Sequence, residues 1–275
     1  MNKKIGFILA LVLISLMMVG TASAGLFDFL GGNNANQTAN DNETFIVGFD
    51  AEFPPYGYKD ANGSYVGFDL DLAKEVCERN NWTFKAQPID WDAKDAELDS
   101  GSIDCIWNGF TIDGRENDYA WSNPYFDNKQ IFVVKSNSNI KSIADLSGKT
   151  VETQKDSSAL AALQGDNKTI AGTFKTLTEV ADYNTAFMDL ESGACDAVAM
   201  DIGVAEYDIS QKNNTADFKI LNESITTEKY GIGFKKGNDA LKDQVQATLD
   251  EMFKDGTVLE IAQKYGISED ALIQP

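Results

Sequence analysis

Residues suited to carboxylate recognition follow one short apolar segment of the chain. The segment 105–107 is typical of a buried strand that ends at Asn108-Gly109, and the loop after it carries Thr111 and Arg115. In an open α/β sheet, ligands bind beyond the carboxyl ends of the strands. Glycine lets a ligand approach the backbone, threonine offers a donor and an acceptor, and arginine offers paired donors that match a carboxylate. We therefore predict a site for the carboxylate of a small zwitterion; the alternative for a lone arginine is a surface position.

An internal repeat puts an acidic residue at the equivalent point of the second half. The segment 98–104 (LDSGSID) recurs at 190–196 (LESGACD), each with a helix end at Ser-Gly, then an aspartate and an apolar strand. The second of these strands, 197–200, ends at Asp201. Two similar α/β lobes would then face each other with Arg115 on one side and Asp201 on the other. That arrangement suits a free amino acid.

A further candidate for anion binding is a pair of serines at the start of a predicted helix. Ser157 and Ser158 precede the apolar segment 159–163, so they occupy the N-cap region. A helix start with free N–H groups and two hydroxyls is a natural anion site. The structural alternative is an ordinary helix cap.

The composition excludes several kinds of chemistry. The chain contains no histidine, which excludes histidine-based triads, histidine proton shuttles and histidine-rich zinc sites. Cys77, Cys105 and Cys195 lie far apart and lack metal-ligand spacing, so we expect no metal and no cofactor. A Cys77–Cys105 disulfide and free buried thiols both remain open. The formal net charge of −20 argues against nucleic acid or an anionic membrane surface as a partner.

The N-terminal segment has the pattern of an export signal. Two lysines precede an apolar run from Ile5 to Val19, and small residues at 21–24 offer a cleavage site. We predict a signal peptide at 1–24 and a disordered polar linker at 25–43. The protein is therefore expected in the periplasm or at the outer cell surface, tethered to the membrane if the signal is not cleaved.

The elements that must position these residues alternate between strand and helix, which favours an α/β fold with parallel-rich sheets. In Asp50–Tyr58 the two prolines predict irregular structure. Asp69 falls in the first turn of a helix, where it suits the helix dipole. The predicted strands include 45–49, 82–84, 105–107, 130–135, 150–153, 197–200 and 230–234. Two amphipathic helices are predicted after them, one from Leu241 to Gly256 and one from Val258 to Gly266.

Several motifs together resemble the extracytoplasmic solute-binding proteins of polar amino acid transporters, the group similar to the glutamine- and histidine-binding proteins. They are the Asp50–Phe53 segment with its double proline, YVGFDLDLAKEV (65–76), the Gly109-Thr111-Arg115 loop, ADLSGKTV (144–151), CDAVAMD (195–201) and EKYGIGFKKG (228–237).

The resemblance covers residues 45–266 and implies a bilobed, type II periplasmic-binding-protein fold. Lobe 1 would comprise 44–131 and 229–275, and lobe 2 would comprise 132–228. The segments QIFVVK (130–135) and KYGIGF (229–234) would carry the two crossings between the lobes.

The resemblance also implies roles for the candidate residues. Arg115 would hold the ligand's α-carboxylate, helped by Thr111 and Ser158. Asp201 would take the α-ammonium together with Thr111 and the Gly109 carbonyl. The full set of expected ligand-binding residues is Asp50, Phe53, Trp91, Asn108, Gly109, Thr111, Arg115, Gln154, Ser157, Ser158 and Asp201.

The ligand's side chain would lie between the rings of Phe53 and Trp91, with Asp50 and Gln154 at its polar end. The acidic residues favour a cationic side chain, whereas Gln154 and Asp50 together suit an amide equally well. The expected ligand is therefore a polar L-amino acid.

The function implied is that of a monomeric binding protein, not an enzyme, that delivers an amino acid to the membrane permease of an ABC transporter. One alternative is a sensory protein that docks to a receptor. Another is a cyclohexadienyl-dehydratase-like enzyme acting on cyclic acids, which would need a catalytic acid in the cleft. Glu52 is the one glutamate beside the predicted site, and it has no evident catalytic partner.

Overall fold

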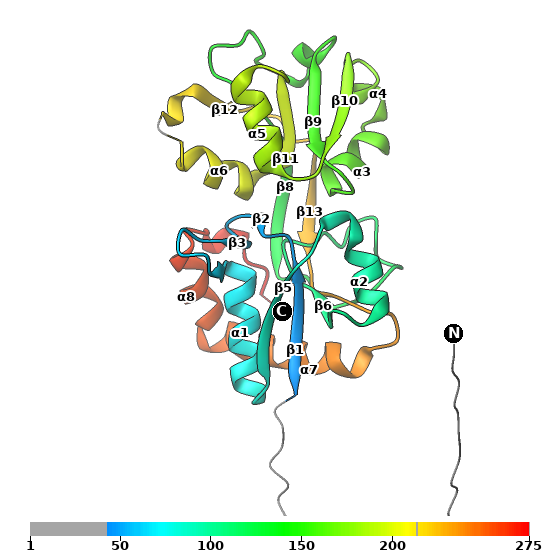
Figure 1. The fold of residues 1–275 in the computed structure, drawn as a ribbon, viewed down its shortest axis with the longest axis vertical. Helices are drawn as coiled ribbons and strands as arrows, with labels where there is room; N and C mark the ends of the chain where they lie inside the picture. Colours follow the sequence, from blue (N-terminus) through cyan, green and yellow to red (C-terminus); the bar gives the residue numbers. More distant parts are fainter. Residues whose placement is uncertain (1–42, 213, 275) are drawn as a thin grey trace, which may run out of the picture. The chain divides into compact units, whose positions relative to one another are not determined.

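Two β-sheets organise the part of the chain that the structure, a computed structural model, describes: residues 43–212 and 214–274 (Figure 1). The predicted signal peptide and nearly all of the predicted linker lie outside these residues. Within them, no helix has the length and apolar character needed to cross a membrane. We call the part built on the first sheet lobe 1 and the part built on the second sheet lobe 2.

The sheet of lobe 1 has five strands in the order β5-β1-β6-β14-β7. These are β1 (Thr44–Phe49), β5 (Thr83–Pro88), β6 (Cys105–Ile106), β7 (Ala120–Trp121) and β14 (Gly233–Phe234). β1 runs parallel to β5 and β6, whereas β14 runs antiparallel to β6 and β7. The flanking helices are α1 (Phe68–Asn80), α2 (Lys94–Ser100), α7 (Asp239–Asp255) and α8 (Thr257–Lys264). Because α7 and α8 pack against α1, the end of the chain completes lobe 1 (Figure 1).

The sheet of lobe 2 has six strands, in the order β10-β9-β11-β8-β12 with β13 also paired to β8. They are β8 (Phe126–Lys135), β9 (Thr150–Gln154), β10 (Thr176–Val180), β11 (Ala197–Asp201), β12 (Phe218–Ile220) and β13 (Thr226–Tyr230). Its helices are α3 (Ser158–Gln164), α4 (Lys168–Ala171), α5 (Tyr183–Ser192) and α6 (Ile202–Ser210). The pairings β9–β10 and β9–β11 are parallel and those of β8 are antiparallel, so both sheets are mixed.

The repeat seen in the sequence has a structural cause in both lobes. α2 and α5 end at a glycine with positive φ, Gly101 at 78° and Gly193 at 83°. The aspartates that follow, Asp104 and Asp196, accept hydrogen bonds from the backbone N–H groups of Ile46 and Thr150. Each aspartate therefore ties the start of its own strand to a neighbouring strand.

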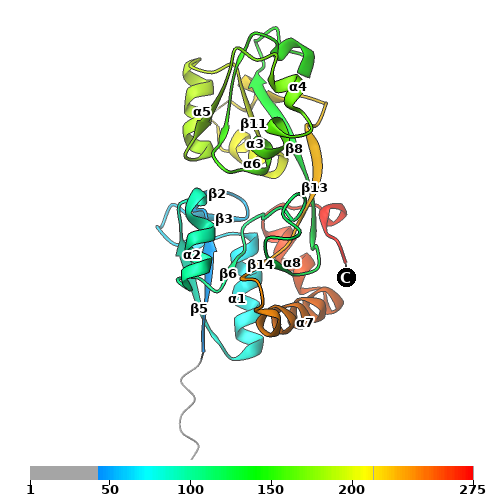
Figure 2. The ribbon, with the colours of Figure 1, turned by 90° about the vertical axis from the view of Figure 1, so that its right-hand side faces the viewer.

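The two lobes are connected by β8 and β13, which run side by side between the sheets (Figure 2). Their antiparallel pairing extends from Phe126↔Tyr230 to Gln130↔Thr226. The part of β8 that crosses between the lobes is therefore its first half, which begins at Phe126, earlier than the predicted segment 130–135. Gln130–Val134 already pair with β11 in lobe 2.

The predicted strand 230–234 is interrupted, since β13 ends at Tyr230 and β14 begins at Gly233. Close packing explains the glycines here: a Cβ on Gly231 or Gly233 would lie 2.7 Å from side-chain atoms of Ile112 or Phe110, respectively. A side chain at either position would therefore require these neighbours to shift.

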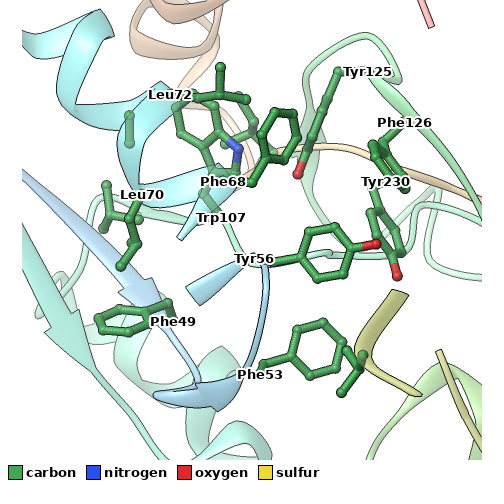
Figure 3. Packing of buried hydrophobic residues seen from close by; sticks show 14 of the residues in the cluster. Phe49, Phe53, Tyr56, Phe68, Leu70, Leu72, Trp107, Tyr125, Phe126 and Tyr230 are labelled. Carbon is green, nitrogen blue, oxygen red and sulfur yellow. The ribbon is translucent and has the colours of Figure 1, made fainter. Parts of the chain in front are cut away.

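A second difference concerns the double proline. Two short strands, β2 (Glu52–Phe53) and β3 (Gly57–Lys59), flank the prolines and form a small sheet with β4 (Tyr65–Val66), where irregular structure was predicted. The turn between β2 and β3 carries Tyr56 into a buried aromatic cluster (Figure 3).

This cluster lies where the crossing strands meet lobe 1. The rings of Phe126 and Tyr230 stack with centroids 5.4 Å apart, and Tyr56 meets both edge-on at 5.5 and 5.3 Å (Figure 3). Edge-to-face and stacked pairs at these separations are favourable beyond the area they bury. The cluster therefore supports the base of the crossing.

The three cysteines are buried and free in the structure. Burial raises the pKa of the Cys77 thiol to about 12, which keeps this group protonated and unreactive at neutral pH.

Candidate functional site

A small cavity with an empty volume of about 290 Å³ lies between the lobes. This volume includes space that is open to solvent. Both lobes contribute to its wall. The lining residues are Phe53, Trp91, Asn108, Gly109, Thr111, Arg115, Gln154, Ser157, Ser158 and Asp201, that is, every predicted site residue except Asp50.

Arg115 stands on the lobe 1 side of this cavity. Its Nη1 donates to the Thr111 carbonyl oxygen at 3.3 Å, and its Nη2 donates across the cleft to the Asp156 carbonyl oxygen at 3.2 Å. The guanidinium also lies over the ring of Phe110, 5.3 Å from its centroid. Gly114, with φ of 81°, allows the tight turn that brings Arg115 back toward Thr111. Backbone carbonyls are weaker acceptors than a carboxylate, so this fork can exchange them for an anionic ligand.

Gly109 exposes its backbone to the cavity because a side chain would not fit there. Its φ is 55°, and a Cβ would lie 2.8 Å from the Phe53 ring. Its N–H donates at 2.6 Å to Asp69, which also accepts from the Tyr125 hydroxyl at 2.8 Å. Asp69 is therefore buried and holds the site loop, a role that its position in the first turn of α1 did not reveal. Burial raises its pKa to about 7.

Ser157 and Ser158 have different hydrogen-bonding roles. Ser157 caps α3 by accepting from the Leu160 N–H at 3.1 Å, as the structural alternative predicted. Ser158 Oγ accepts from Gln130 Nε2 at 2.8 Å and donates to Glu228 Oε1 at 3.2 Å. The Ser158 hydroxyl is thus committed to buried neighbours, although both serines line the cavity.

Asp201 lies on the opposite wall, at the end of β11. Its Oδ2 accepts hydrogen bonds from Asn128 Nδ2 at 2.8 Å, Gln130 Nε2 at 2.7 Å and the Tyr230 hydroxyl at 2.5 Å. Burial, and after it the charge of Glu228, raises the pKa of Asp201 to about 8.

Three neighbours of Asp201 were not predicted as functional: Asn128, Gln130 and Glu228. We call these three, with Ser158 and Asp201, the polar cluster. The sequence signal that could have identified Asn128 and Gln130 is their spacing of two residues, which puts both on one face of β8. On that face they are buried among apolar positions.

The two aromatic residues lie on the lobe 1 side. Phe53 packs near Tyr56 and Tyr183, with centroid distances of 5.7 and 6.1 Å. Trp91 meets Phe110 edge-on at 5.5 Å. Both line the cavity and present apolar surface to it.

Asp50 lies behind the cavity wall. Gln154 Nε2 donates to Asp50 Oδ2 at 2.6 Å and to the Ala181 carbonyl oxygen at 3.1 Å. Burial raises the pKa of Asp50 to about 6, and a hydrogen bond from the Glu52 N–H partly offsets this effect.

Asp50 also borders a second, larger hollow, which we call the outer groove. Trp91 lines both spaces. The outer groove is strongly acidic, and Lys155 is its one basic lining residue. Its acidic lining residues are Asp50, Glu52, Asp90, Asp92, Glu97, Glu179 and Asp182.

Several side-chain contacts join the lobes around these spaces. Lys94, buried in lobe 1, pairs with the Asp156 carboxylate of lobe 2. Lys155 pairs with Asp92 at 2.5 Å. Glu52 accepts from Asn184 and lines the outer groove rather than the cavity. In the described ranges, no group of histidine, cysteine, aspartate and glutamate residues is arranged to hold a metal ion.

Comparison with known proteins gives matches over both lobes. The sequence model of the bacterial extracellular solute-binding proteins, family 3, matches residues 45–268. A probable histidine-binding protein of Neisseria gonorrhoeae is 32% identical over 251 residues, which cover 87% of this chain and 89% of that protein.

Two solved structures share the fold. An ABC uptake transporter substrate-binding protein from Streptococcus pneumoniae with bound histidine has a TM-score of 0.80 at 34% identity, covering 84% of this chain and 95% of that chain. An ancestral arginine-binding protein bound to glutamine has a TM-score of 0.74 at 39% identity, covering 82% and 98%.

Proposed function

Because the chain belongs to the bacterial extracellular solute-binding proteins, family 3, we propose that it captures a polar L-amino acid between its lobes and delivers it to the permease of an ABC transporter. The observation that carries this proposal is that Arg115 and Asp201 line opposite walls of one small cavity. A free amino acid carries a carboxylate and an ammonium group close together, and these two side chains complement both.

Each pole of the ligand has its own partners in this proposal. Arg115 binds the α-carboxylate with its paired donors, and the Thr111 hydroxyl adds a further hydrogen bond. Asp201 and the Gly109 carbonyl accept from the α-ammonium. Asn108 and Ser157 complete the wall around these groups.

The side chain of the ligand extends between Phe53 and Trp91 toward Gln154 and Asp50. The aromatic rings supply apolar contact area, and the polar pair at the far end fixes the side-chain chemistry. The names of similar proteins support this class of ligand, since they include a histidine-binding protein and a structure with bound glutamine.

Ligand capture and lobe closure are coupled because the two lobes supply the two poles of the site. A ligand that contacts both lobes binds the closed form more tightly than the open one and shifts the population toward it. The closed form is then the one that the permease recognises.

The remaining parts of the proposal concern location and organisation. The protein is exported by a signal peptide at 1–24, works as a monomer outside the cytoplasm, and is joined to its signal by a linker at 25–43. Lobe 1 comprises 44–131 and 229–275 and lobe 2 comprises 132–228. The extracellular proteins of the family support this location.

A thermal-shift screen of residues 40–275 against the L-amino acids tests the proposal. The protein is first dialysed from mild denaturant to remove any ligand retained during purification. A ligand at about 100 times its dissociation constant should add about 2.7 kcal/mol of stability. We expect a shift with at least one polar L-amino acid and none with its D-enantiomer.

The chain offers a matched control, because its two arginines are Arg79 and Arg115. Arg79 lies on the surface, paired with Glu75 and Asp255. Arg115→Ala should lose the ligand-induced shift while Arg79→Ala keeps it. Absence of a shift with every amino acid would contradict the proposal, and turnover of a cyclic acid would then favour the dehydratase-like alternative.

A further inference from the structure

Two buried carboxylates lie side by side in the polar cluster. Asp201 is 3% exposed and Glu228 is 5% exposed. Asn128 Nδ2 donates to Asp201 Oδ2 at 2.8 Å and to Glu228 Oε1 at 2.7 Å. Gln130 Nε2 donates to the same two oxygens, each at 2.7 Å. Because two nitrogens share both oxygens, the carboxylates are adjacent.

The groups that contact this pair are neutral donors. Besides the two amides of β8, the Ser158 hydroxyl of α3 donates to Glu228, and the Tyr230 hydroxyl of β13 donates to Asp201. Tyr56 from the β2–β3 turn and Tyr183 of α5 also lie near Asp201. Burial, and after it the charge of Asp201, raises the pKa of both phenols. None of these groups supplies a positive charge.

The charged groups around the pair do not form ion pairs with it either. Arg115 lines the same cavity, but its guanidinium donates to the backbone carbonyls of Thr111 and Asp156. No lysine or arginine of residues 43–212 and 214–274 forms an ion pair with either carboxylate. Asp69 and Glu206, which act on the neighbouring Tyr56, add further negative charge.

Two adjacent carboxylates in a buried site cannot both be ionised without a large cost. Burial, and after it the negative charge of Glu228, therefore opposes ionisation of the Asp201 carboxyl and raises its pKa. The orientation of the amides fits this requirement. Asn128 Oδ1 and Gln130 Oε1 have no hydrogen-bond partner among the described residues, because both NH₂ groups turn toward the carboxylates.

We propose that Asp201 and Glu228 share one proton in the ligand-free protein, and that the α-ammonium of the bound amino acid displaces this proton. The ammonium keeps its own protons. The O–H bond of the shared carboxyl breaks, its electron pair stays on the carboxylate oxygen, and the proton passes to solvent.

This inference rests on the proposed function and assigns Glu228 as a positioning residue that makes binding proton-linked. The raised pKa of Asp201 supports it, since burial and the Glu228 charge both hold a proton on the pair at neutral pH. Linkage then predicts that affinity increases with pH, by up to about tenfold per pH unit, until the pair is ionised without ligand.

The test is titration calorimetry of the wild-type protein at pH 7.5 in phosphate and in Tris, which differ in their enthalpy of ionisation. The probes are L-glutamine, L-arginine and L-lysine, whose side chains do not titrate near this pH. Asp50, with a pKa of about 6, is already ionised and does not contribute. The apparent binding enthalpies in the two buffers should differ by an amount that corresponds to the release of somewhat less than one proton for each amino acid bound.

Equal apparent enthalpies in the two buffers, with binding intact, would overturn the proton linkage and leave the proposed function standing. Absence of binding of all three probes, together with no thermal shift from any L-amino acid, would overturn both. The wild-type affinity measured between pH 6.5 and 8 gives an independent readout, and a constant dissociation constant over this range would also overturn the linkage.

The variant Glu228→Gln assigns the proton to the pair. It keeps an oxygen acceptor for Asn128 and Gln130 but removes one charge, so proton release should fall to less than half and the pH dependence should flatten. Glu223→Gln is the matched control in lobe 2, because Glu223 is exposed and accepts from the Ile143 N–H away from the cavity. If Glu228→Gln released as much proton as the wild-type protein, the assignment of the proton to Asp201 and Glu228 would be wrong. If this variant does not fold, the comparison of wild-type binding in phosphate and Tris decides the proposal.

Discussion

Gln154 of lobe 2 donates a hydrogen bond of 2.6 Å to the buried carboxylate of Asp50 in lobe 1. The bond joins the lobes at the boundary between the cavity and the outer groove. A hydrogen bond to a charged group contributes about 1.5–3 kcal/mol, and this bond is available only when the lobes are together. It therefore favours the closed form directly.

The first prediction follows from this bond. Gln154→Ala should weaken binding of the amino acid by about 10- to 100-fold, because closure would leave Asp50 without its cross-lobe donor. Titration calorimetry measures the change. Gln244→Ala is the matched control, since Gln244 is exposed and donates to Asn80 within lobe 1. An equal loss of affinity in both variants would contradict the assigned role of Gln154.

The second prediction concerns the shape of the cation at position 115. Arg115→Lys retains the positive charge but loses the planar pair of donors that matches a carboxylate. We expect the dissociation constant to increase by about 10- to 100-fold, with a larger increase for Arg115→Ala. Arg79→Lys should bind like the wild-type protein. Wild-type affinity in Arg115→Lys would mean that charge alone, and not bidentate geometry, holds the ligand.

The third prediction compares two ion pairs between the lobes. Lys94 is 1% exposed and lies 5.2 Å from the Trp91 ring centroid, with Asp156 as its partner. The Lys155–Asp92 pair is exposed, with 57% and 42% of the side chains accessible. Exposed pairs contribute about 0–1 kcal/mol, so Lys155→Met should change affinity by less than about fivefold.

Lys94→Met should weaken binding by about 10-fold, because the buried ammonium of Lys94 forms its ion pair with Asp156 across the closed interface. Small-angle scattering of the ligand-free variants gives a second readout. The radius of gyration of Lys94→Met should be larger than that of Lys155→Met. The prediction fails if the exposed pair has the larger effect on either measurement.

The fourth prediction is a decrease of stability with increasing pH. Burial raises the pKa values of Asp50 to about 6 and of Asp69 and Asp208 to about 7, from an ordinary 3.8. The folded state therefore binds more protons than the unfolded state between about pH 4 and 8, and stability decreases as pH increases through this window. Asp255, with its pKa lowered to about 2, contributes stability that is lost only in stronger acid.

The midpoint of thermal unfolding should thus be about 5 °C higher at pH 6 than at pH 8. Differential scanning calorimetry at constant ionic strength measures this difference. The variant Asp69→Asn should reduce it, since one of the titrating groups is removed. A midpoint that is higher at pH 8 would show that these carboxyls are solvated in the folded protein.

Sequence reasoning located the parts of the site that depend on local pattern. The Ser-Gly helix ends and the strands that follow them are local features, and they led to Gly109 and Asp201 at the corresponding strand ends. Arg115 and Thr111 followed from their place in the same loop. Both walls of the cavity were therefore predictable as sets of residues.

Residues whose role depends on distant contacts were not predictable in this way. Asp69 is a first-turn acid by sequence, but its function comes from the N–H of Gly109, forty positions away. Glu228 and Asn128 meet Asp201 only because β8, β11 and β13 pair in one particular register. The same register decided where the crossing begins.

The position of β14 determines the order in which the lobes can be completed during synthesis. This strand enters the sheet of lobe 1 between β6 and β7, so that sheet stays incomplete until the chain beyond Gly233 has been made. All strands of lobe 2 lie between Phe126 and Tyr230 and are available earlier. A nascent chain can therefore assemble lobe 2 first, while β6 keeps an open edge that could pair with other chains. The last helices, α7 and α8, then close lobe 1 against α1.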